Sequence, residues 1–431
     1  MSTYHDKSAF SSMGDGISDT HVTVDDLQEI AHRTFGDSAN FGPDLSFTSI
    51  GEGSGFMSRI VVVDPDWKEP APKFAPKNFI AKISSMAGIV ANFSKMDAST
   101  FEGIDHETGS EMMRALEGNL KKLHNNEVII YDWFYKHKID IPKLQVYYSK
   151  SFSQHNINKG LLLMEYKPNA TSLHVWDNFA PNDLLPILRA KAKLEAWADN
   201  FPEEEKAKLK MNPFIDFYPQ ILNEKNVSMN FGVVEKFANN EIKELINKTK
   251  DLGSIIYDFT FADSINKRLG MKPTFAHGDL WSSNMLMKKR DGGGYDLEAL
   301  IDFQTAHWGN PATDLARLFI NTLSGKDRRE HWESLTETFY GYLKEEFGDK
   351  ELPYTLEQCK ESYHQYMPTG GLLTIPMFGG LFAMVVYGDG PEEFKKHVET
   401  VLNEKLIAIL EDVIESQEKL NLTTNGTQRS E

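Results

Sequence analysis

The stretch that decides the fold lies at residues 277–304, where HGDLWSSN (277–284) is followed, after a short segment, by LIDFQ (300–304). Residues 285–289 and 295–301 have the pattern of two strands, and the glycine-rich turn DGGG (291–294) joins them. The hairpin predicted here returns Asp302 to the side of Asn284, where one cation could bind both side chains. Asp279, shortly before Asn284, completes a set of three oxygen-bearing side chains.

These three side chains suit the transfer of a phosphoryl group. That reaction needs a carboxylate to orient or deprotonate an attacking hydroxyl, and hard oxygen ligands for Mg²⁺, which neutralises charge on the phosphates. Asp279 precedes Asn284 by the interval found in the H-R-D-L-x-x-x-N catalytic loop of kinases. Each residue alone is more typical of a turn or a strand end. The three together, with a hairpin between them, favour the catalytic interpretation.

A lysine in the N-terminal half is a candidate for binding nucleotide phosphate. Residues 79–84 (FIAKIS) have the pattern of a strand, in which Phe79, Ala81 and Ile83 share one face and Lys82 lies on the other. A lysine between apolar neighbours either protects the edge of a sheet or needs an anion as its partner.

Residues 116–138 are predicted to form a long helix that supplies this anion. One face of it consists of Leu116, Leu120, Leu123, Glu127, Ile130 and Phe134. Because a carboxylate on a buried face is costly unless it is paired, we predict an ion pair between Lys82 and Glu127. The alternative is that Glu127 lies at the edge of the apolar face and is solvated.

Two further segments are predicted to contact the nucleotide. Gly51, Gly53, Ser54 and Gly55 precede a strand at 58–63, and glycines let backbone N–H groups approach phosphate oxygens closely. Taken alone, such a turn is more often an ordinary hairpin turn. Residues 161–166 (LLLMEY) are predicted as the strand that connects the two halves of the chain. Backbone groups around Glu165 and Tyr166 would meet adenine there; the alternative is a plain buried strand.

The order of elements predicts an α+β, bilobal arrangement. Residues 1–20 are predicted as a flexible tail and 21–165 as a small β-rich N-lobe that binds nucleotide. Residues 166–417 are predicted as a larger, mostly helical C-lobe with the catalytic loop and the acceptor pocket, and 418–431 as a second flexible tail. A cleft between two lobes is a natural site for a ligand.

HGDLWSSN followed by LIDFQ resembles the catalytic core of the kinase-like small-molecule phosphotransferases. These include choline kinases, aminoglycoside phosphotransferases and the ecdysteroid-kinase-like (CHK-kinase-like) family, to which the similarity is greatest. The order of landmarks agrees over most of residues 45–390 and most closely at 275–318, and HNNE at 124–127 resembles the corresponding helix. The resemblance implies a protein-kinase-like fold, ATP and Mg²⁺ as cofactors, Asp279 as the catalytic base, and Asn284 and Asp302 as metal ligands.

Two details refine this resemblance. Gln304 stands where protein kinases have the glycine of Asp-Phe-Gly, which matches the ecdysteroid-kinase-like pattern and weakens a protein-kinase interpretation. Asp314, in GNPATDL (309–315), resembles the second aspartate motif of the family. We interpret Asp314 as a structural brace for the catalytic loop, and His277 as a packing and hydrogen-bonding residue of that loop.

The composition limits the kinds of molecule that the chain is expected to bind. The formal charge of −17, from 46 Lys and Arg against 63 Asp and Glu, would repel a nucleic-acid backbone or an anionic membrane. The single cysteine, Cys359, excludes an intrachain disulfide, and the polar first residues contain no secretory signal, so the cytoplasm is the expected compartment. The uncharged segment 370–388 approaches the length of a membrane span, but its five glycines and Pro376 favour a buried helix of a folded core. No protein partner is inferred.

The expected activity is the phosphorylation of a hydroxyl group on a small molecule, steroid-like or another metabolite. A protein acceptor is disfavoured because the interval from Asp302 to Asp314 leaves no room for a peptide-docking activation segment, and no Ala-Pro-Glu follows. The alternatives are a choline-, ethanolamine- or aminoglycoside-type kinase, and an inactive nucleotide-binding protein. The intact set of Lys82, Glu127, Asp279, Asn284 and Asp302 favours an active enzyme.

Overall fold

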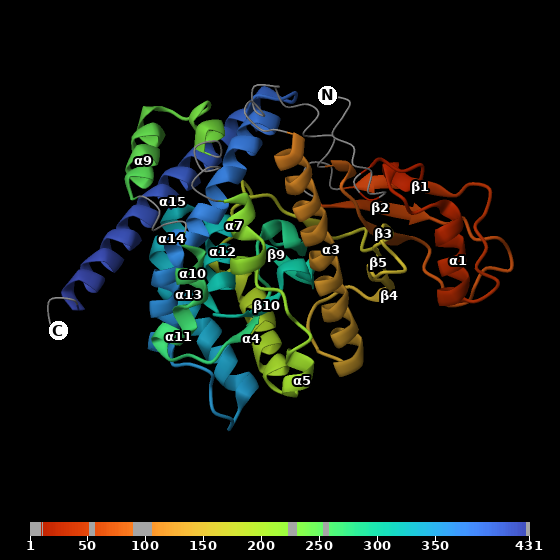
Figure 1. The fold of residues 1–431 in the computed structure, drawn as a ribbon, viewed down its shortest axis with the longest axis horizontal. Coiled ribbons are helices and arrows are strands. Elements are labelled where there is room, and N and C mark those ends of the chain that lie inside the picture. Colours follow the sequence, from red (N-terminus) through yellow and green to blue (C-terminus); the bar gives the residue numbers. More distant parts are fainter. Residues whose placement is uncertain are drawn as a thin grey trace. The chain divides into compact units, whose positions relative to one another are not determined.

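The computed structural model of the chain describes residues 10, 12–50, 57–88, 106–222, 231–252 and 258–427. It divides into two compact units, one of Met1–Lys138 and Lys143–Asn169, the other of Ile139–Pro142 and Ala170–Glu431. The first is built on an antiparallel sheet and the second is mostly helical (Figure 1). The predicted α+β class, with a small β-rich N-terminal part and a larger helical C-terminal part, is confirmed. The boundary between the two units lies after Asn169, whereas the predicted boundary lay after residue 165. Residues 139–142 also belong to the second unit.

The sheet of the first unit has five strands in the order β1-β2-β3-β5-β4, and neighbouring strands run antiparallel. The strands are β1 (Ser46–Ile50), β2 (Ser58–Asp64), β3 (Phe79–Ser84), β4 (Val146–Lys150) and β5 (Leu161–Glu165). All residues of β3 are buried, which is expected of a central strand covered on both faces. Lys82 therefore does not protect a sheet edge.

One face of this sheet packs on helix α1 (Val24–Phe35), and the helix α3 (His106–His137) also belongs to this unit. Phe79, Ala81 and Ile83 join one hydrophobic cluster with Leu27 and Ile30 of α1, as strand alternation predicts. α1 begins with a capping box between Thr23 and Asp26, which pairs the first free N–H groups of the helix.

The predicted N-terminal tail needs correction within its described part. Ile17–Asp19 forms a 3-10 helix, and Ile17 belongs to the same core cluster as α1. Phe10 is buried, with its ring centre 5.1 Å from that of Phe152. The polar composition of residues 1–20 concealed these two apolar anchors, whose burial offsets the entropy of ordering the segment.

The helices of the second unit, among the described residues, include η3 (Pro181–Leu184), α4 (Leu185–Asp199), α5 (Glu203–Lys206), α6 (Pro213–Asp216), α7 (Tyr218–Ile221), α9 (Asn240–Asp251), α10 (Phe259–Asp263), α11 (Ile265–Leu269), α12 (Ala312–Thr322), α13 (Gly325–Phe347), α14 (Leu356–Leu381), η7 (Phe382–Val386) and α15 (Glu392–Thr427). Within this unit α4 packs against α13, and α14 packs against α12 and α15.

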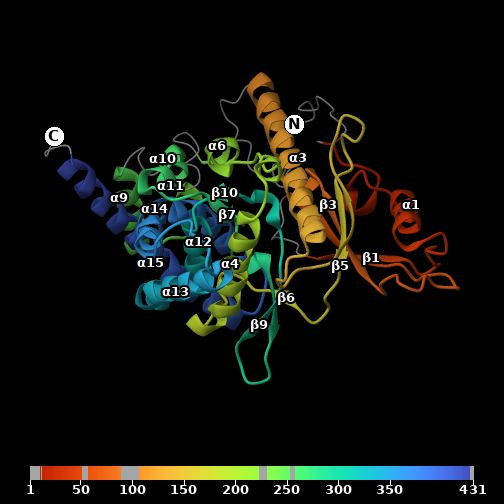
Figure 2. The same cartoon turned by 90° about the horizontal axis from the view of Figure 1, so that it is seen from below.

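The short strands of this unit form the hairpin that the sequence predicts. β8 (Met285–Lys289) pairs with β9 (Tyr295–Leu300), and β6 (Thr171–Ser172) extends the ribbon on the side of β8. The pair is seen as the teal ribbon labelled β9 in Figure 2. Separately, β7 (Thr274–Ala276) pairs with β10 (His307–Gly309). These two pairings fix both ends of the catalytic loop.

The uncharged segment 370–388 is helical, in the second half of α14 and in the π-helix η7. By length and composition alone, Leu356–Val386 is the one helix among the described residues that could cross a membrane, and 56% of its most apolar window is buried within the structure.

The predicted C-terminal tail also needs correction. α15 continues through Thr427, so that much of 418–431 is helical. Lys419 pairs with Glu415 at 2.7 Å one turn earlier, and Gln417 donates to Asn421. These contacts between residues four apart support the helix beyond its buried part.

Candidate active site

Lys82 and Glu127 form the ion pair that the sequence predicts. Nζ of Lys82 lies 2.8 Å from Oε1 and 2.7 Å from Oε2 of Glu127, and both residues are buried. Glu127 is 1% exposed, so it is not a solvated residue at the edge of the helix face. Burial lowers the pKa of His124, one turn earlier on the same helix, to about 4, so that its ring is neutral near pH 7.

The catalytic loop begins where β7 ends, and glycine is required at its second position. Gly278 has a φ of +83°, and a Cβ atom there would come within 2.2 Å of the carbonyl oxygen of Thr305. His277 is buried, and its Nε2 lies 3.0 Å from the carbonyl oxygen of Ile301. Its ring centre is 4.4 Å from that of Phe303. The predicted packing and hydrogen-bonding role of His277 is therefore confirmed.

Asp279 is held by side chains on both sides. Asn284 donates through Nδ2 to Oδ2 of Asp279 at 2.9 Å and to its carbonyl oxygen at 2.8 Å. Arg317, from α12, brings Nε and Nη2 each within 3.0 Å of Oδ1. The carboxylate therefore keeps a fixed orientation while its side chain stays 23% exposed.

The predicted hairpin forms, and it pairs the backbone just before Asp302 with the backbone of Asn284. Met285 pairs with Leu300, and the N–H of Ile301 donates to the carbonyl oxygen of Asn284 at 3.0 Å. Asp302 itself has a φ of +65°, a conformation that only a few residue types adopt readily. The backbone turns sharply at this position, two residues after Leu300, which ends β9.

Asp314 braces the loop, as the sequence indicated. Its carboxylate accepts from the backbone N–H of His277 at 2.9 Å and of Gly278 at 2.8 Å. Lys191 lies 2.9 Å from the same carboxylate and 2.6 Å from Glu195, to which Tyr354 also donates. Burial alone would raise the pKa of Asp314, but the charges of Lys191 and His277 and the hydrogen bonds outweigh it and lower that pKa.

Sequence reasoning missed Arg317 and the pair of Lys191 and Glu195. A signal for Arg317 was present, since Asp314, Arg317 and Asn321 are spaced along one face of an otherwise apolar helix. Lys191 and Glu195 gave none, because an i,i+4 pair of opposite charges is typical of a solvated helix surface. Only tertiary packing shows that both are 1% exposed.

Two groups of predicted nucleotide-binding residues remain untested. Gly51, Gly53, Ser54 and Gly55 lie outside the described residues. Glu165 ends β5, and its carboxylate accepts from the backbone N–H of Gln145 at 3.2 Å. The contact of adenine with Glu165 and Tyr166 stays a prediction.

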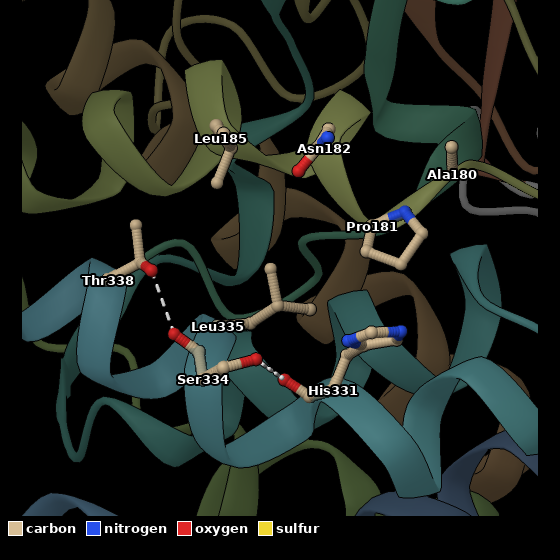
Figure 3. Close-up of a pocket in the computed structure, with 8 residues that line it drawn as sticks. All are labelled: Ala180, Pro181, Asn182, Leu185, His331, Ser334, Leu335 and Thr338. Carbon is tan, nitrogen blue, oxygen red and sulfur yellow. Dashed lines mark hydrogen bonds between the residues drawn. The ribbon is translucent and has the colours of Figure 1, made fainter.

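A hollow lies between η3, the start of α4 and α13 (Figure 3). It has a volume of about 430 Å³ and is lined by Ala180, Pro181, Asn182, Leu185, His331, Ser334, Leu335 and Thr338. None of the predicted site residues lines it, and the hydroxyls of Ser334 and Thr338 already donate to helix carbonyl oxygens.

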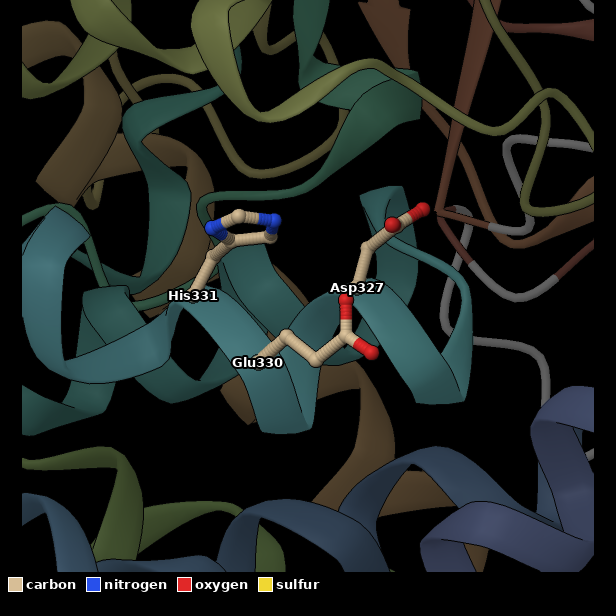
Figure 4. A group of neighbouring side chains, drawn as sticks. All are labelled: Asp327, Glu330 and His331. Atoms are coloured by element: carbon tan, nitrogen blue, oxygen red, sulfur yellow. The ribbon is translucent and has the colours of Figure 1, made fainter.

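Asp327, Glu330 and His331 gather on α13 beside that hollow, with their ligand atoms within 4.8 Å of one another (Figure 4). Asp327 already accepts from Ser324, the residue that caps the helix, and Glu330 is exposed. Acidic side chains in the first turns of a helix are also favoured by its dipole. We therefore assign no metal site to this group.

Comparison with curated proteins gives two relatives from Caenorhabditis elegans. The chain is 26% identical over 252 residues to the "Uncharacterized kinase-like protein D1044.1", a match covering 57% of this chain and 63% of that protein. It is 28% identical over 106 residues to the "Uncharacterized oxidoreductase dhs-27", covering 23% of this chain and 13% of that protein. The chain thus matches less than two thirds of the length of either relative.

Comparison with solved structures gives small-molecule kinases and phosphotransferases. Choline kinase from Cryptosporidium parvum Iowa II is 13% identical, with 92% of this chain and 98% of that chain covered and a TM-score of 0.45. The GDP complex of wild-type aminoglycoside 2'-phosphotransferase-IIIa is 13% identical, with 88% and 97% covered and a TM-score of 0.44.

The broadest match is to a protein family and extends over nearly the whole chain. Residues 11–420 match it, including every described site residue above. The chain belongs to the DUF1679 family, described as "Uncharacterized oxidoreductase dhs-27".

Proposed function

We propose that this chain is a phosphotransferase that moves the γ-phosphate of ATP onto a hydroxyl group of a small molecule. The observation that carries the proposal is the surroundings of Asp279. A carboxylate has about four lone-pair sites on its two oxygens. Within the described residues, Arg317 occupies the two on Oδ1 and Asn284 occupies one on Oδ2. One site on Oδ2 remains, and the hydroxyl of an acceptor can donate to it.

Asp279 then orients the acceptor more than it activates it. In a loose transition state for phosphoryl transfer, the attacking hydroxyl gives up its proton late, so a strongly basic group is not required. A carboxylate fixed by Arg317 and Asn284 is suited to this work, because its position is set before the substrate arrives. Asp314 holds the preceding loop residues in place from behind.

Asn284 and Asp302 fit a magnesium ion by their chemistry. The amide nitrogen of Asn284 faces two acceptors on Asp279, which leaves its amide oxygen as the atom for a cation. Together with the carboxylate of Asp302 this gives an all-oxygen donor set, which Mg²⁺ prefers. When bound, the ion would neutralise charge on the phosphates.

Lys82 is the proposed partner of the nucleotide phosphates. Its ion pair with Glu127 keeps the ammonium group extended from the buried strand β3. In kinases, a lysine held in this way binds the phosphates of ATP.

The names of the relatives support part of this proposal. One curated relative is called kinase-like, in agreement with the chemistry of the site. The word oxidoreductase in the family description belongs to a protein of which this chain matches 13%. As the finer assignment we propose an ecdysteroid-kinase-like enzyme acting on a steroid-like or other metabolite, with choline-, ethanolamine- and aminoglycoside-type kinases as alternatives.

The test uses the full chain, γ-labelled ATP and a small-molecule extract of cells. We expect label in a small-molecule product, and Asp279→Asn should lower turnover by at least about a hundredfold while ATP-analogue binding persists. Asp296→Asn, at an exposed position of β9, is the matched control and should keep full activity. Label in protein bands without a small-molecule product, or near-normal turnover of Asp279→Asn, would contradict the proposal.

A further inference from the structure

Arg317 places a positive charge beside the proposed catalytic carboxylate. Two of its nitrogens lie within 3.0 Å of Oδ1 of Asp279, and Nη1 donates to Oγ1 of Thr374 on α14 at 3.0 Å. Its guanidinium carbon lies 5.0 Å from the ring centre of Trp281. The Arg317 side chain is 17% exposed and that of Asp279 is 23% exposed, so the pair remains accessible from one side.

The charge of Asp279 is compensated by Arg317 before any substrate binds. Behind the loop, Lys191 pairs with both Asp314 and Glu195. Tyr218 and Tyr366, both close enough to feel the Asp279 charge, are buried phenols whose pKa values burial raises. Both are therefore neutral at physiological pH. Asp302, which follows the hairpin, is the carboxylate that the proposed function assigns to the metal.

We infer that the acceptor carries no positive charge: it is a neutral or acidic alcohol that presents an oxygen atom to Arg317. The inference rests on the proposed function and names the class of its substrate. It sets aside cationic acceptors, such as choline-like and aminoglycoside-like amines.

Unused hydrogen-bond donors near Asp279 support an oxygen-bearing acceptor. A guanidinium has five N–H donors, and the contacts with Asp279 and Thr374 use three of them. Among the residues that the structure describes, the other two have no partner. Spare donors match hydroxyl, carbonyl or acidic oxygens of a substrate and not an ammonium group.

A cationic acceptor would lose both of the attractions that usually bind it. A quaternary ammonium is recognised by an aromatic face or by an uncompensated carboxylate. Here the chain's own guanidinium covers the ring of Trp281 and also neutralises Asp279. The cation would instead lie next to Arg317, and like charges in contact disfavour binding by well over tenfold.

The experiment separates acceptors by charge. A small-molecule extract is passed at pH 7 through a strong cation exchanger, and each fraction is incubated with the full chain and γ-labelled ATP. We expect labelled product from the unretained fraction, which holds neutral and acidic alcohols. Product from the retained fraction alone would overturn the inference and leave the proposed function standing. The absence of product from both fractions would overturn the proposed function and the inference with it.

Variants of Arg317 test its part in this selection. Arg317→Gln removes the positive charge. We expect the rate with the unretained fraction, divided by the rate with the retained fraction, to fall by about tenfold or more. KM for the accepted fraction should rise more than kcat falls. Arg317→Lys keeps the charge and should stay closer to the unaltered chain. Arg189→Gln, which removes an arginine paired with Glu345 on the surface, is the matched control. An unchanged ratio in Arg317→Gln would show that Arg317 does not select the acceptor.

Discussion

Asp314→Asn should destabilise the second unit and misplace the catalytic loop. The Asp314 carboxylate serves two backbone N–H groups, of His277 and Gly278, and also faces Lys191. An asparagine has one oxygen, so it can accept from only one of these N–H groups, and its own amide nitrogen then faces the other. Lys191 keeps Glu195 as a partner, so the ion pair is not abolished.

The magnitude follows from these contacts. One charge-assisted hydrogen bond is lost, worth about 1.5–3 kcal/mol, and one buried N–H is left without a partner, which costs about 1–3 kcal/mol. The sum is about 2.5–6 kcal/mol. For a unit of this size each kcal/mol lowers Tm by about 2 °C, so we expect a fall of about 5–12 °C.

The assay is thermal unfolding together with amide hydrogen exchange at residues 277–279. Exchange at these amides should accelerate in Asp314→Asn, whereas Asp296→Asn on exposed β9 should leave both Tm and exchange unchanged. A Tm for Asp314→Asn within about 1 °C of the unaltered chain would refute the bracing role.

The pH dependence gives a second readout of the same group. The pKa of Asp314 is lowered, because the interactions with Lys191 and His277 outweigh the effect of burial. A lowered pKa contributes stability above the ordinary value of 3.8, and this stability is lost as the pH falls through the lower folded value. Asp314→Asn should therefore lose less stability than the unaltered chain below about pH 4.

Three more outcomes are expected. Turnover should require Mg²⁺ or Mn²⁺, because Asn284 and Asp302 offer oxygen ligands, and full activity in excess chelator would speak against these ligands. Lys82→Met should lower Tm more than the double variant Lys82→Met/Glu127→Gln, because the single change leaves Glu127 charged and buried; equal losses would argue against the pair. Burial, aided by the charge of Arg328, lowers the pKa of Lys405 from 10.5 to about 7. Between pH 7 and pH 10.5 the unfolded chain therefore binds more protons than the folded chain, so stability rises with pH in this range. Lys405→Met should therefore raise Tm at pH 7 and below and remove this rise, and a lower Tm throughout would count against it.

Much of the candidate site could be predicted because its signals are local. The turn at 291–294 and the apolar runs beside it predict a hairpin, and a hairpin necessarily returns residue 302 to the side of residue 284. The position of Lys82 on a strand and of Glu127 on a helix face follows from periods of 2 and 3.6 residues. A buried charge needs a partner, which was enough to pair the two before any contact was known.

The flexible tails predicted for the two ends of the chain were wrong within the described residues, and the reason is physical. Composition averages over a segment, whereas burial depends on single side chains. Phe10 and Ile17 are enough to anchor a polar segment to the core of the first unit. At the other end, α15 continues past its buried part because contacts between residues four apart extend a helix that has already formed.

By itself, the sequence determined which residues carry the chemistry: Asp279 and Asn284 before the hairpin, Asp302 after it, and Lys82 with Glu127. The tertiary structure alone decided the charge around them. Arg317 reaches Asp279 from a helix 38 residues further along the chain, and Lys191 and Glu195 are buried only because other helices cover them. Periodicity and spacing specify which face of its own element a residue occupies, but the partner across that face is set by the packing of distant segments.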